Sequence, residues 1–539
     1  MTEAWVEWSH NWWILSLSKE WSAEKLFRSI DESELILRRI RSWARVVLEE
    51  ISGVTLTATQ SDRLVGFWLL HLVHQIVGLD NSARAIHLAG EHSLRLQIPH
   101  SQREHMTLSY KSADYRDRYL NLIHELGSRH LRVDTLSLER IPVKSRGVLR
   151  NAKDILARVT SERSPGQRQA IWIIDPYLKL TYSEFLKARR RTSRLVSWIP
   201  AHYSPKSVTS DIAWSKRLEL SRSIEITDAE SLAKALVPLL IPYGYAEDLA
   251  DSFRELSRHT PAPPRVLYTA NGLQSSFTFQ LAASLWGESG TLVCAHQHGG
   301  HTGLDKRHAL EDLEVELSHR YYTFGWTDDR SGIEALPIPQ PENGLKVEPT
   351  RILLMSLESS PFTYRLQPFC VAHHVDLCLK ETRAFLDNST QKESIVVRCR
   401  GAEAETLGLA TMGIEVEALH GFGAKSIAIS ALVVHNYLGT SWLESLAMNV
   451  PTVCFIPPGI HAFRSAAQPF VDRLQQVGIL HYSGRDAARF VNSFKGDLNT
   501  WWKSAEVQEA REAFVARYAN FSDDWLAAWQ AEFESLLAE

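Results

Sequence analysis

The fold is decided by the stretch Val433-Val434-His435-Asn436-Tyr437-Leu438-Gly439-Thr440-Ser441-Trp442-Leu443-Glu444-Ser445-Leu446-Ala447-Met448-Asn449-Val450-Pro451-Thr452-Val453. Its apolar start, residues 431–434, is typical of a buried parallel strand. Gly439 permits a tight turn, and Ser441 with Glu444 three residues later predicts a capping box at the start of a helix. Residues 452–456 predict the next strand. A helix that begins at the carboxyl end of a parallel strand offers backbone N–H groups to an anion, so the stretch predicts an anion site.

Length and composition limit the number of domains, the class of partner and the cellular location that we expect. A chain of 539 residues is too long for one hydrophobic core. The net charge of −4 gives no general reason to expect a nucleic-acid partner. The five cysteines are odd in number and scattered, which favours reduced thiols in the cytoplasm. The first 20 residues lack signal-peptide features, and Leu64 to Leu79 is short for a membrane span. We therefore expect a cytoplasmic protein without a transmembrane segment, in peripheral contact with the inner membrane at most.

Apolar strand-like runs alternate with helical patterns on both sides of a proline-rich segment. Before it lie runs at 170–174, 265–269, 291–295 and 321–324, and after it runs at 351–356, 395–398, 431–434 and 452–456. The segment itself, 336–350, contains four prolines and Asn343-Gly344. Such alternation predicts doubly wound α/β domains. We expect an N-terminal helical plus α/β domain at 1–342, a second α/β domain at 343–500 and a helical tail at 501–539.

Two Rossmann-like domains that face each other across a cleft resemble the GT-B glycosyltransferases. In that architecture the N-terminal domain takes the acceptor and the C-terminal domain the nucleotide sugar. Further stretches resemble a bacterial family of surface-carbohydrate biosynthesis transferases. They are the early helix at 62–70, the glycine-rich QHGG element Gln297-His298-Gly299-Gly300 with Gly303, the segment 320–326, Thr440 to Glu444, Asn449 to Thr452, and 501–508.

This resemblance implies transfer of an activated sugar to a surface glycan or lipid-linked acceptor. Capsule transferases of similar layout use CMP-linked ulosonic acids such as Kdo or pseudaminic acid, so the resemblance also suggests a CMP-linked donor. Two alternatives remain open. One is a nucleotide-sugar epimerase or hydrolase of the same two-domain architecture, and the other is a non-catalytic subunit of a glycan-assembly complex.

The donor side is expected in the C-terminal domain. Backbone N–H groups and hydroxyls at Gly439, Thr440 and Ser441 are candidates for the donor phosphate, although an ordinary helix cap would show the same pattern. Glu444 could bind ribose or sugar hydroxyls or complete the capping box. Four further candidates lie near the ends of two strands: Arg398, Arg400, His435 and Asn436. An arginine there could pair with phosphate or with a sugar carboxylate, or form a strand-end salt bridge.

The catalytic base is expected in the N-terminal domain. His298 lies in a glycine-rich turn after a strand, and an imidazole that titrates near neutrality can accept the proton of an acceptor hydroxyl. It could equally be a neutral histidine that shapes the loop. Asp305 and Glu314 are the carboxylate candidates, while Gln297, Gly299 and Gly300 are expected to bind acceptor or form the loop. The histidines around this turn lack a cysteine or carboxylate pattern that would predict a metal, so we expect neither metal nor cofactor.

Overall fold

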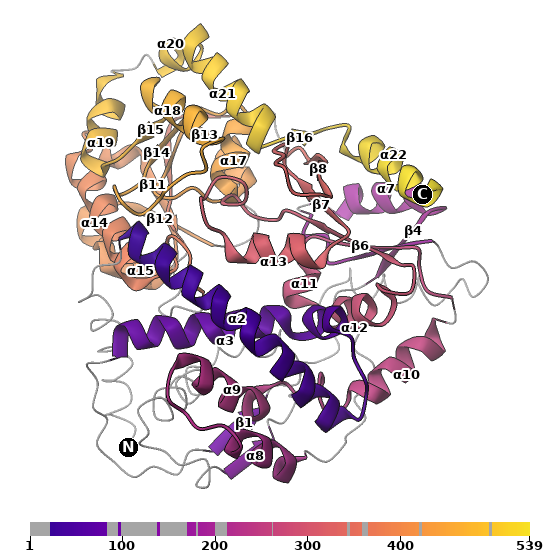
Figure 1. Cartoon of the computed structure of the whole chain (residues 1–539). Helices are drawn as coiled ribbons and strands as arrows, with labels where there is room; N and C mark the ends of the chain where they lie inside the picture. Colours follow the sequence, from indigo (N-terminus) through magenta and orange to yellow (C-terminus); the bar gives the residue numbers. More distant parts are fainter. Residues whose placement is uncertain are drawn as a thin grey trace.

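The computed structural model describes residues 22–83, 95–98, 137–140, 170–178, 180, 182–199, 213–260, 262–341, 345, 347–357, 365–419, 423–494 and 498–539. These residues form two α/β units, each on a six-stranded sheet, with a layer of helices below them (Figure 1). The early tryptophans and most of the histidine-rich segment after Ala83 lie outside the described residues. The predicted N-terminal helical part is therefore seen from Ala23 to Ala83.

The N-terminal sheet has the order β4-β3-β5-β6-β7-β8, and every pair in it is parallel. Its first strand, β3, is a fully buried run of apolar residues. The next strand, β4, lies on one side of β3 and all later strands on the other, so the topology switches direction between β3 and β5. The strands are β3 (Ile171–Ile174), β4 (Val196–Ile199), β5 (Val266–Thr269), β6 (Leu292–His296), β7 (Arg320–Thr323) and β8 (Ile333–Ala335).

The C-terminal sheet has the order β12-β11-β10-β13-β14-β15 and is also parallel throughout. Its first strand lies at the centre, so the direction switches between β10 and β13. Its strands are β10 (Glu348–Met355), β11 (Ile395–Cys399), β12 (Glu415–Ala418), β13 (Ser430–His435), β14 (Thr452–Phe455) and β15 (Leu480–His481). Both sheets are doubly wound, as the sequence predicts, and ligands of such sheets bind outside the carboxyl ends at the switch point.

A helical layer covers the N-terminal sheet. Its members are α2 (Ala23–Ser52), α3 (Ala58–Ala83), α8 (Trp214–Arg222), α9 (Ala229–Leu240), α10 (Leu249–His259), α11 (Gly272–Ser275), α12 (Phe277–Trp286) and α13 (Ala309–Leu317). Much of α3 is buried, and with it the polar residues His71, His74 and Gln75. His74 Nδ1 accepts the N–H of Leu366 at 3.1 Å, which ties this layer to the C-terminal half. Among the described helices, none combines the length and apolar character that a membrane crossing requires.

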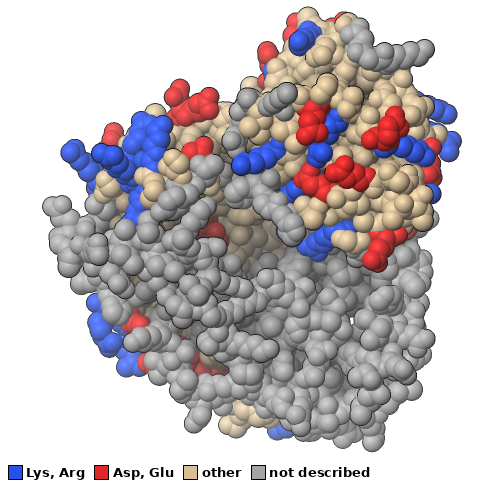
Figure 2. All heavy atoms as spheres, turned by 180° about the vertical axis from the view of Figure 1, so that it is seen from behind, with Lys and Arg blue, Asp and Glu red and all other residues tan. Residues whose placement is uncertain are grey.

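The remaining helices flank the two sheets. They are α7 (Tyr182–Thr192) beside β4, and α14 (Ala372–Asn388), α15 (Gly401–Leu407), α16 (Ala424–Ala428), α17 (Thr440–Ala447), α18 (Gln468–Gln476) and α19 (Gly484–Ser493) around the C-terminal sheet. Lys and Arg gather over α7, whereas the C-terminal unit carries both charge signs (Figure 2). A small parallel pair, β1 (Arg95–Ile98) and β2 (Ser137–Arg140), stands apart from both sheets.

The C-terminal tail contacts both units. α20 (Leu498–Trp502) leads into α21 (Ala505–Tyr518), which packs against α17 and α18. The chain then returns to the N-terminal unit, where β16 (Phe521–Ser522) pairs with β9 (Ile338–Pro339) of the proline-rich segment. The last helix, α22 (Trp525–Ala538), covers the N-terminal sheet, with the Trp529 ring 4.7 Å from that of Tyr268 (Figure 1). The tail thus connects the two units at their junction.

Candidate functional site

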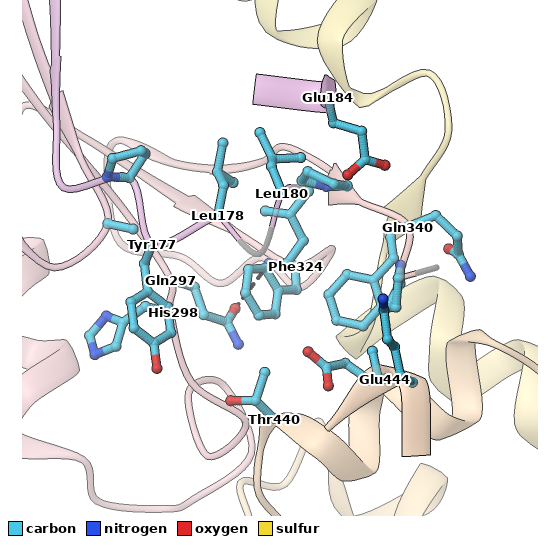
Figure 3. Close-up of a pocket in the computed structure, with 18 of the residues that line it drawn as sticks. Tyr177, Leu178, Leu180, Glu184, Gln297, His298, Phe324, Gln340, Thr440 and Glu444 are labelled. Atoms are coloured by element: carbon cyan, nitrogen blue, oxygen red, sulfur yellow. Dashed lines mark hydrogen bonds between the residues drawn. The ribbon is translucent and has the colours of Figure 1, made fainter. Parts of the chain in front are cut away.

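A pocket of about 690 Å³ lies between the carboxyl ends of the two sheets. From the N-terminal unit it receives Tyr177 after β3, Ala270 after β5 and His298 after β6. From the C-terminal unit it receives Thr440 and Glu444 of α17, the helix that follows β13. In Figure 3 these two residues face His298 and Tyr177 from the opposite side of the pocket. The pocket therefore reaches both topological switch points.

The predicted glycine-rich turn forms one wall, and Gln297 holds its shape. The Gln297 Oε1 atom accepts the N–H of Phe324 at 2.9 Å and the indole N–H of Trp326 at 2.8 Å. Its Nε2 donates to the carbonyl of Gly299 at 2.8 Å. Gln297 thus lines the pocket while its polar atoms serve the turn, which favours the loop role over direct acceptor binding.

The same turn touches the opposing unit backbone to backbone. A Cβ atom placed on Gly300 would lie 2.5 Å from the carbonyl carbon of Gly439 and 2.9 Å from the backbone nitrogen of Thr440. At Gly299, by contrast, a Cβ would meet nothing within 4 Å. Only glycine at position 300 lets the N-terminal turn approach the start of α17 so closely.

The predicted capping box at the start of α17 is wrong. The N-cap residue is Gly439, and no side chain caps the helix. Ser441 lies inside the first turn, and Glu444 lies two residues beyond the third helical position, so the two cannot form a box. The Glu444 carboxylate points into the pocket instead, although the residue is only 3% exposed (Figure 3). The first N–H groups of α17 are therefore not taken by a capping side chain, and α17 opens toward the pocket.

Basic side chains lie on the C-terminal side of the pocket. Arg398, at the end of β11, lines it together with Lys425 and Ser426 of α16. Arg398 also forms an ion pair with Glu417, and it donates to the carbonyl of Ala418 at 3.2 Å. Burial by itself would raise the pKa of Glu417, but hydrogen bonds from Ser426 and Arg398 outweigh it and lower the pKa. The strand-end salt bridge predicted for Arg398 is present, and because Arg398 also lines the pocket, its pairing with a phosphate or sugar carboxylate stays a prediction.

Five other predicted donor residues do not line the pocket. Gly439 and Ser441 flank the lining residue Thr440, and the other three are Arg400, His435 and Asn436. Arg400 is exposed at the N-cap of α15. His435 is fully buried, its Nε2 lies 2.8 Å from the hydroxyl of Ser445, and burial lowers its pKa to about 3. Asn436 accepts the N–H of Leu357 at 2.7 Å and donates to Thr382 at 2.9 Å. His435, the last residue of β13, and Asn436, the next residue, thus stabilise the switch point from inside the fold.

On the acceptor side, His298 lies between Tyr177 and Glu314. Its Nδ1 is 3.6 Å from Glu314 Oε1, and its ring meets that of Tyr177 edge-on at 5.9 Å between centroids. Behind it, Glu314 accepts hydrogen bonds from Gln274 at 2.7 Å and Tyr321 at 3.1 Å. The structure brings together two of the three predicted catalytic residues, with His298 at the pocket and Glu314 buried behind it.

Burial shifts both groups toward their neutral forms. It lowers the pKa of His298 to about 4, with a further contribution from Arg365. Burial raises the pKa of Glu314 to about 8, although the hydrogen bonds from Gln274 and Tyr321 act in the opposite direction. At neutral pH the His298 imidazole is therefore unprotonated and can accept a proton. The Glu314 carboxyl group is largely protonated and can donate a hydrogen bond.

Asp305, the third predicted catalytic residue, is not brought to the pocket. It is 1% exposed, and its carboxylate faces His461 Nδ1 at 2.8 Å and His301 Nδ1 at 3.3 Å. Burial would raise its pKa, but these two histidines outweigh burial and lower it. Among the described residues, His301, Asp305 and His461 are the group whose spacing could hold a metal ion, and none of them lines the pocket.

Sequence reasoning missed Tyr177 as a pocket residue. It is 53% exposed and has a φ of 51°, a left-handed conformation that is rare for an aromatic residue. Asp175, two residues earlier, also has a positive φ of 49°. Strained backbone of this kind is concentrated at functional sites. The only signal in the sequence was the position of Asp175-Pro176-Tyr177 directly after the strongest predicted strand.

Three solved structures are similar in part. A protein from Listeria monocytogenes assigned as a UDP-N-acetylglucosamine 2-epimerase is 11% identical and covers 68% of this chain and 96% of its own, with a TM-score of 0.39. MurG from Acinetobacter baumannii is 10% identical and covers 68% and 99%, with a TM-score of 0.35. Anabaena HepE in complex with UDP is 11% identical and covers 68% and 100%, with a TM-score of 0.36.

No curated protein matches the sequence. The model of the LIC12162 family transferase matches residues 92–533, a span that includes both sheets, the pocket and most of the tail. The expectation of a transferase is thereby confirmed at the level of enzyme class. The chain belongs to the LIC12162 family of transferases.

Proposed function

We propose that this protein transfers a sugar from a nucleotide-activated donor to a glycan or lipid-linked acceptor bound in the same pocket. The observation that carries the proposal is the start of α17. It opens toward the pocket without a side-chain cap, and it touches the glycine-rich turn that presents His298. A helix N-terminus is favourable for a phosphate, and a leaving nucleotide phosphate gains negative charge during sugar transfer.

The C-terminal wall would hold the donor. Backbone N–H groups at Gly439, Thr440 and Ser441 would bind the phosphate, and Glu444 would accept hydrogen bonds from ribose or sugar hydroxyls. Arg398 and Lys425 add positive charge on the same side. For the donor we propose a CMP-linked ulosonic acid, which carries one phosphate and one carboxylate. Two cations beside a helix N-terminus support this choice, together with the similar layout of capsule transferases that use such donors.

The N-terminal wall would hold and activate the acceptor. His298 would accept the proton of the attacking hydroxyl, and Glu314 would fix the orientation of the imidazole from behind. Tyr177, Leu178 and Phe324 give this side an apolar surface that suits the face of a sugar ring or a lipid. We propose further that the transfer needs no metal at the pocket and takes place at the cytoplasmic side of the membrane.

A thermal-shift screen with CMP, UDP, GDP and dTDP, followed by an acceptor-dependent transfer assay, tests this proposal. We expect CMP to raise the melting temperature most, and sugar release from the donor to depend on acceptor. If UDP or GDP stabilises the protein and CMP does not, the ulosonate part is wrong. If no nucleotide stabilises it, the donor site is wrong. A donor whose sugar is epimerised or released without acceptor would instead indicate the epimerase or hydrolase alternative.

A further inference from the structure

A second polar cluster joins the two units outside the pocket. Asp305 forms an isolated antiparallel bridge with Phe463, a residue of the loop after β14. Two hydrogen bonds flank the bridge, from the N–H of Lys306 to Ala462 at 2.9 Å and from the N–H of Arg464 to Leu304 at 2.9 Å. The loop after the glycine turn and the loop after β14 are therefore fixed backbone to backbone. Side chains on the two loops are held at defined separations, which a metal site requires.

Three metal-ligating side chains converge at this junction. His301 and Asp305 come from the N-terminal unit and His461 from the C-terminal unit, and their ligand atoms all lie within 4.8 Å of one another. His301 Nδ1 and Asp305 Oδ2 are 3.3 Å apart. Two ligands about 2.1 Å from a zinc ion at the tetrahedral angle are separated by roughly 3.4 Å. The spacing therefore matches one edge of a tetrahedral site.

The cluster satisfies itself only in part by hydrogen bonding, through His461 Nδ1 and Asp305 Oδ1 at 2.8 Å. His301 Nδ1 and Asp305 Oδ2 are both buried, and neither makes a hydrogen bond within the described residues, although they are neighbours. His461 Nε2 is buried without a hydrogen-bond partner as well. Asp305 and His461 side chains are only 1% and 2% exposed. Each buried polar atom of this kind calls for a partner, and a bound ion is one of the few that fits.

The negative charge of the buried Asp305 carboxylate also favours a bound cation. A buried carboxylate needs a positive partner. Arg464 and Arg330 direct their guanidinium groups to Glu311, at 2.7 Å and 2.5 Å. Arg464 gives Asp305 only a bond to its backbone carbonyl, at 3.1 Å. The ion pairs of the Asp305 carboxylate among the described residues are those with the two histidines.

Aromatic side chains pack around the two imidazoles of the cluster. The rings of His301 and His461 are stacked, with an angle of 12° between them, so that they approach Asp305 in parallel. Phe369 packs against both rings, with centroids 4.7 Å from His461 and 5.8 Å from His301. An apolar shell of this kind limits solvent access and strengthens metal binding.

We propose that His301, Asp305 and His461 bind one divalent transition-metal ion that links the two units at their bridge. Two imidazoles and one carboxylate are ligands that zinc accepts readily, with a fourth position left for water. The site goes beyond the proposed function and does not depend on it, since no donor or acceptor is involved. The rival explanation is a histidine–aspartate–histidine hydrogen-bond chain that holds a proton instead of a metal.

Metal analysis of the full-length protein tests the site. After treatment with a chelator and return of zinc, we expect one equivalent of zinc per chain and a higher melting temperature. Asp305→Asn and His461→Gln should weaken zinc binding by at least about 100-fold, because each removes a ligand. The matched control is His481→Gln, since His481 is another half-buried histidine of the C-terminal unit but bonds only to the carbonyl of Gly478. It should bind zinc like the wild type.

Cobalt gives a readout that needs no variant. Co²⁺ added to the wild-type apoprotein should produce the visible absorption of tetrahedral cobalt, and zinc should displace it. The proposal is overturned if the wild type takes up no stoichiometric zinc and shows no cobalt absorption bands. The rival explanation, a histidine–aspartate–histidine hydrogen-bond chain, predicts that result. Equal zinc binding by the wild type, Asp305→Asn and His461→Gln would also overturn it. If either variant fails to fold, His301→Gln at the more exposed ligand replaces it.

Discussion

Gly300 packs against Gly439, so the turn that carries His298 and the start of α17 meet without an intervening side chain. The contact joins the two units at the wall of the pocket. It brings the proposed base and the proposed phosphate site to one place, and it explains why the first turn has glycine at position 300. At Gly439 a Cβ atom would instead meet the ring of Tyr437. Each half alone is a common strand–turn–helix element. The combination forms a site because the two backbones touch.

The first prediction concerns this contact. Gly300→Ala should lower the free energy of unfolding by about 1–3 kcal/mol, because the new methyl group meets backbone that has little freedom to move. It should also weaken donor binding by displacing α17. The measurement is urea unfolding together with nucleotide titration.

Gly299→Ala is the matched control. It adds the same methyl group one residue earlier, where the structure leaves open space. Its stability and nucleotide affinity should stay close to those of the wild type. Equal effects of the two substitutions would contradict the proposed contact.

The second prediction concerns Glu444. Because the capping box is absent, Glu444→Gln should leave the melting temperature nearly unchanged while it weakens donor binding by roughly 10-fold or more, the loss expected for a hydrogen bond to a charged group. Calorimetric titration checks the affinity. A loss of stability with normal affinity and turnover would show that Glu444 has only a structural role.

The third prediction concerns the pair His298 and Glu314. His298→Gln should lower kcat by about 100-fold or more, the usual contribution of a general base. Glu314→Gln should lower kcat less, leave KM unchanged and shift the acid limb of the pH profile, because the two groups titrate together. In the wild type that limb should lie below pH 6.5, since burial lowers the pKa of His298 to about 4. An unchanged kcat for His298→Gln would remove His298 as the base.

The fourth prediction concerns acid stability. Burial lowers the pKa values of five described histidines to about 3 or 4: His74, His296, His298, His308 and His435. Between pH 6.5 and about 4 the unfolded chain binds more protons at these positions than the folded chain. Their contribution to stability is therefore complete above pH 6.5 and is lost as the pH falls.

Urea unfolding at pH 7.5, 6 and 5 measures this loss. The free energy of unfolding should fall less steeply with decreasing pH in His435→Gln than in the wild type. The difference should reach up to about 1.4 kcal/mol per pH unit, because one such histidine is removed. Equal unfolding midpoints at the three pH values, with the wild type as stable at pH 5 as at pH 7.5, would contradict the histidine account.

The sequence predicts the two sheets well because their central strands are buried on both faces. Runs such as 171–174 and 432–434 are apolar throughout, which leaves few other structures open to them. The edge strand β12 escaped prediction because three of its four residues are exposed and its sequence, Glu-Val-Glu-Ala, has no apolar run. Helix α9 continues through Pro238 to Leu240, although a proline within a helix removes a backbone hydrogen bond. At its end the buried Arg217 donates to the carbonyls of Pro238 and Ile241.

The site was less predictable because it depends on contacts between distant segments. Thr440, Glu444, His298 and Arg398 reach the pocket, whereas Asn436 bonds within the fold. Nothing in the local sequence distinguishes a side chain that reaches the pocket from one that bonds within the fold. The capping box failed for a local reason, since Gly439 ends the turn and starts the helix two residues before Ser441.

The central claim is that a nucleotide sugar binds with its phosphate at the start of α17 and opposite the glycine turn. Hydrogen–deuterium exchange with and without the nucleotide that stabilises the protein tests it most directly. The account predicts slower exchange on binding in two segments, 296–303 and 437–446, with little change at the tail helix α22. Binding that leaves 437–446 unprotected, or protects only segments away from the pocket, would contradict it.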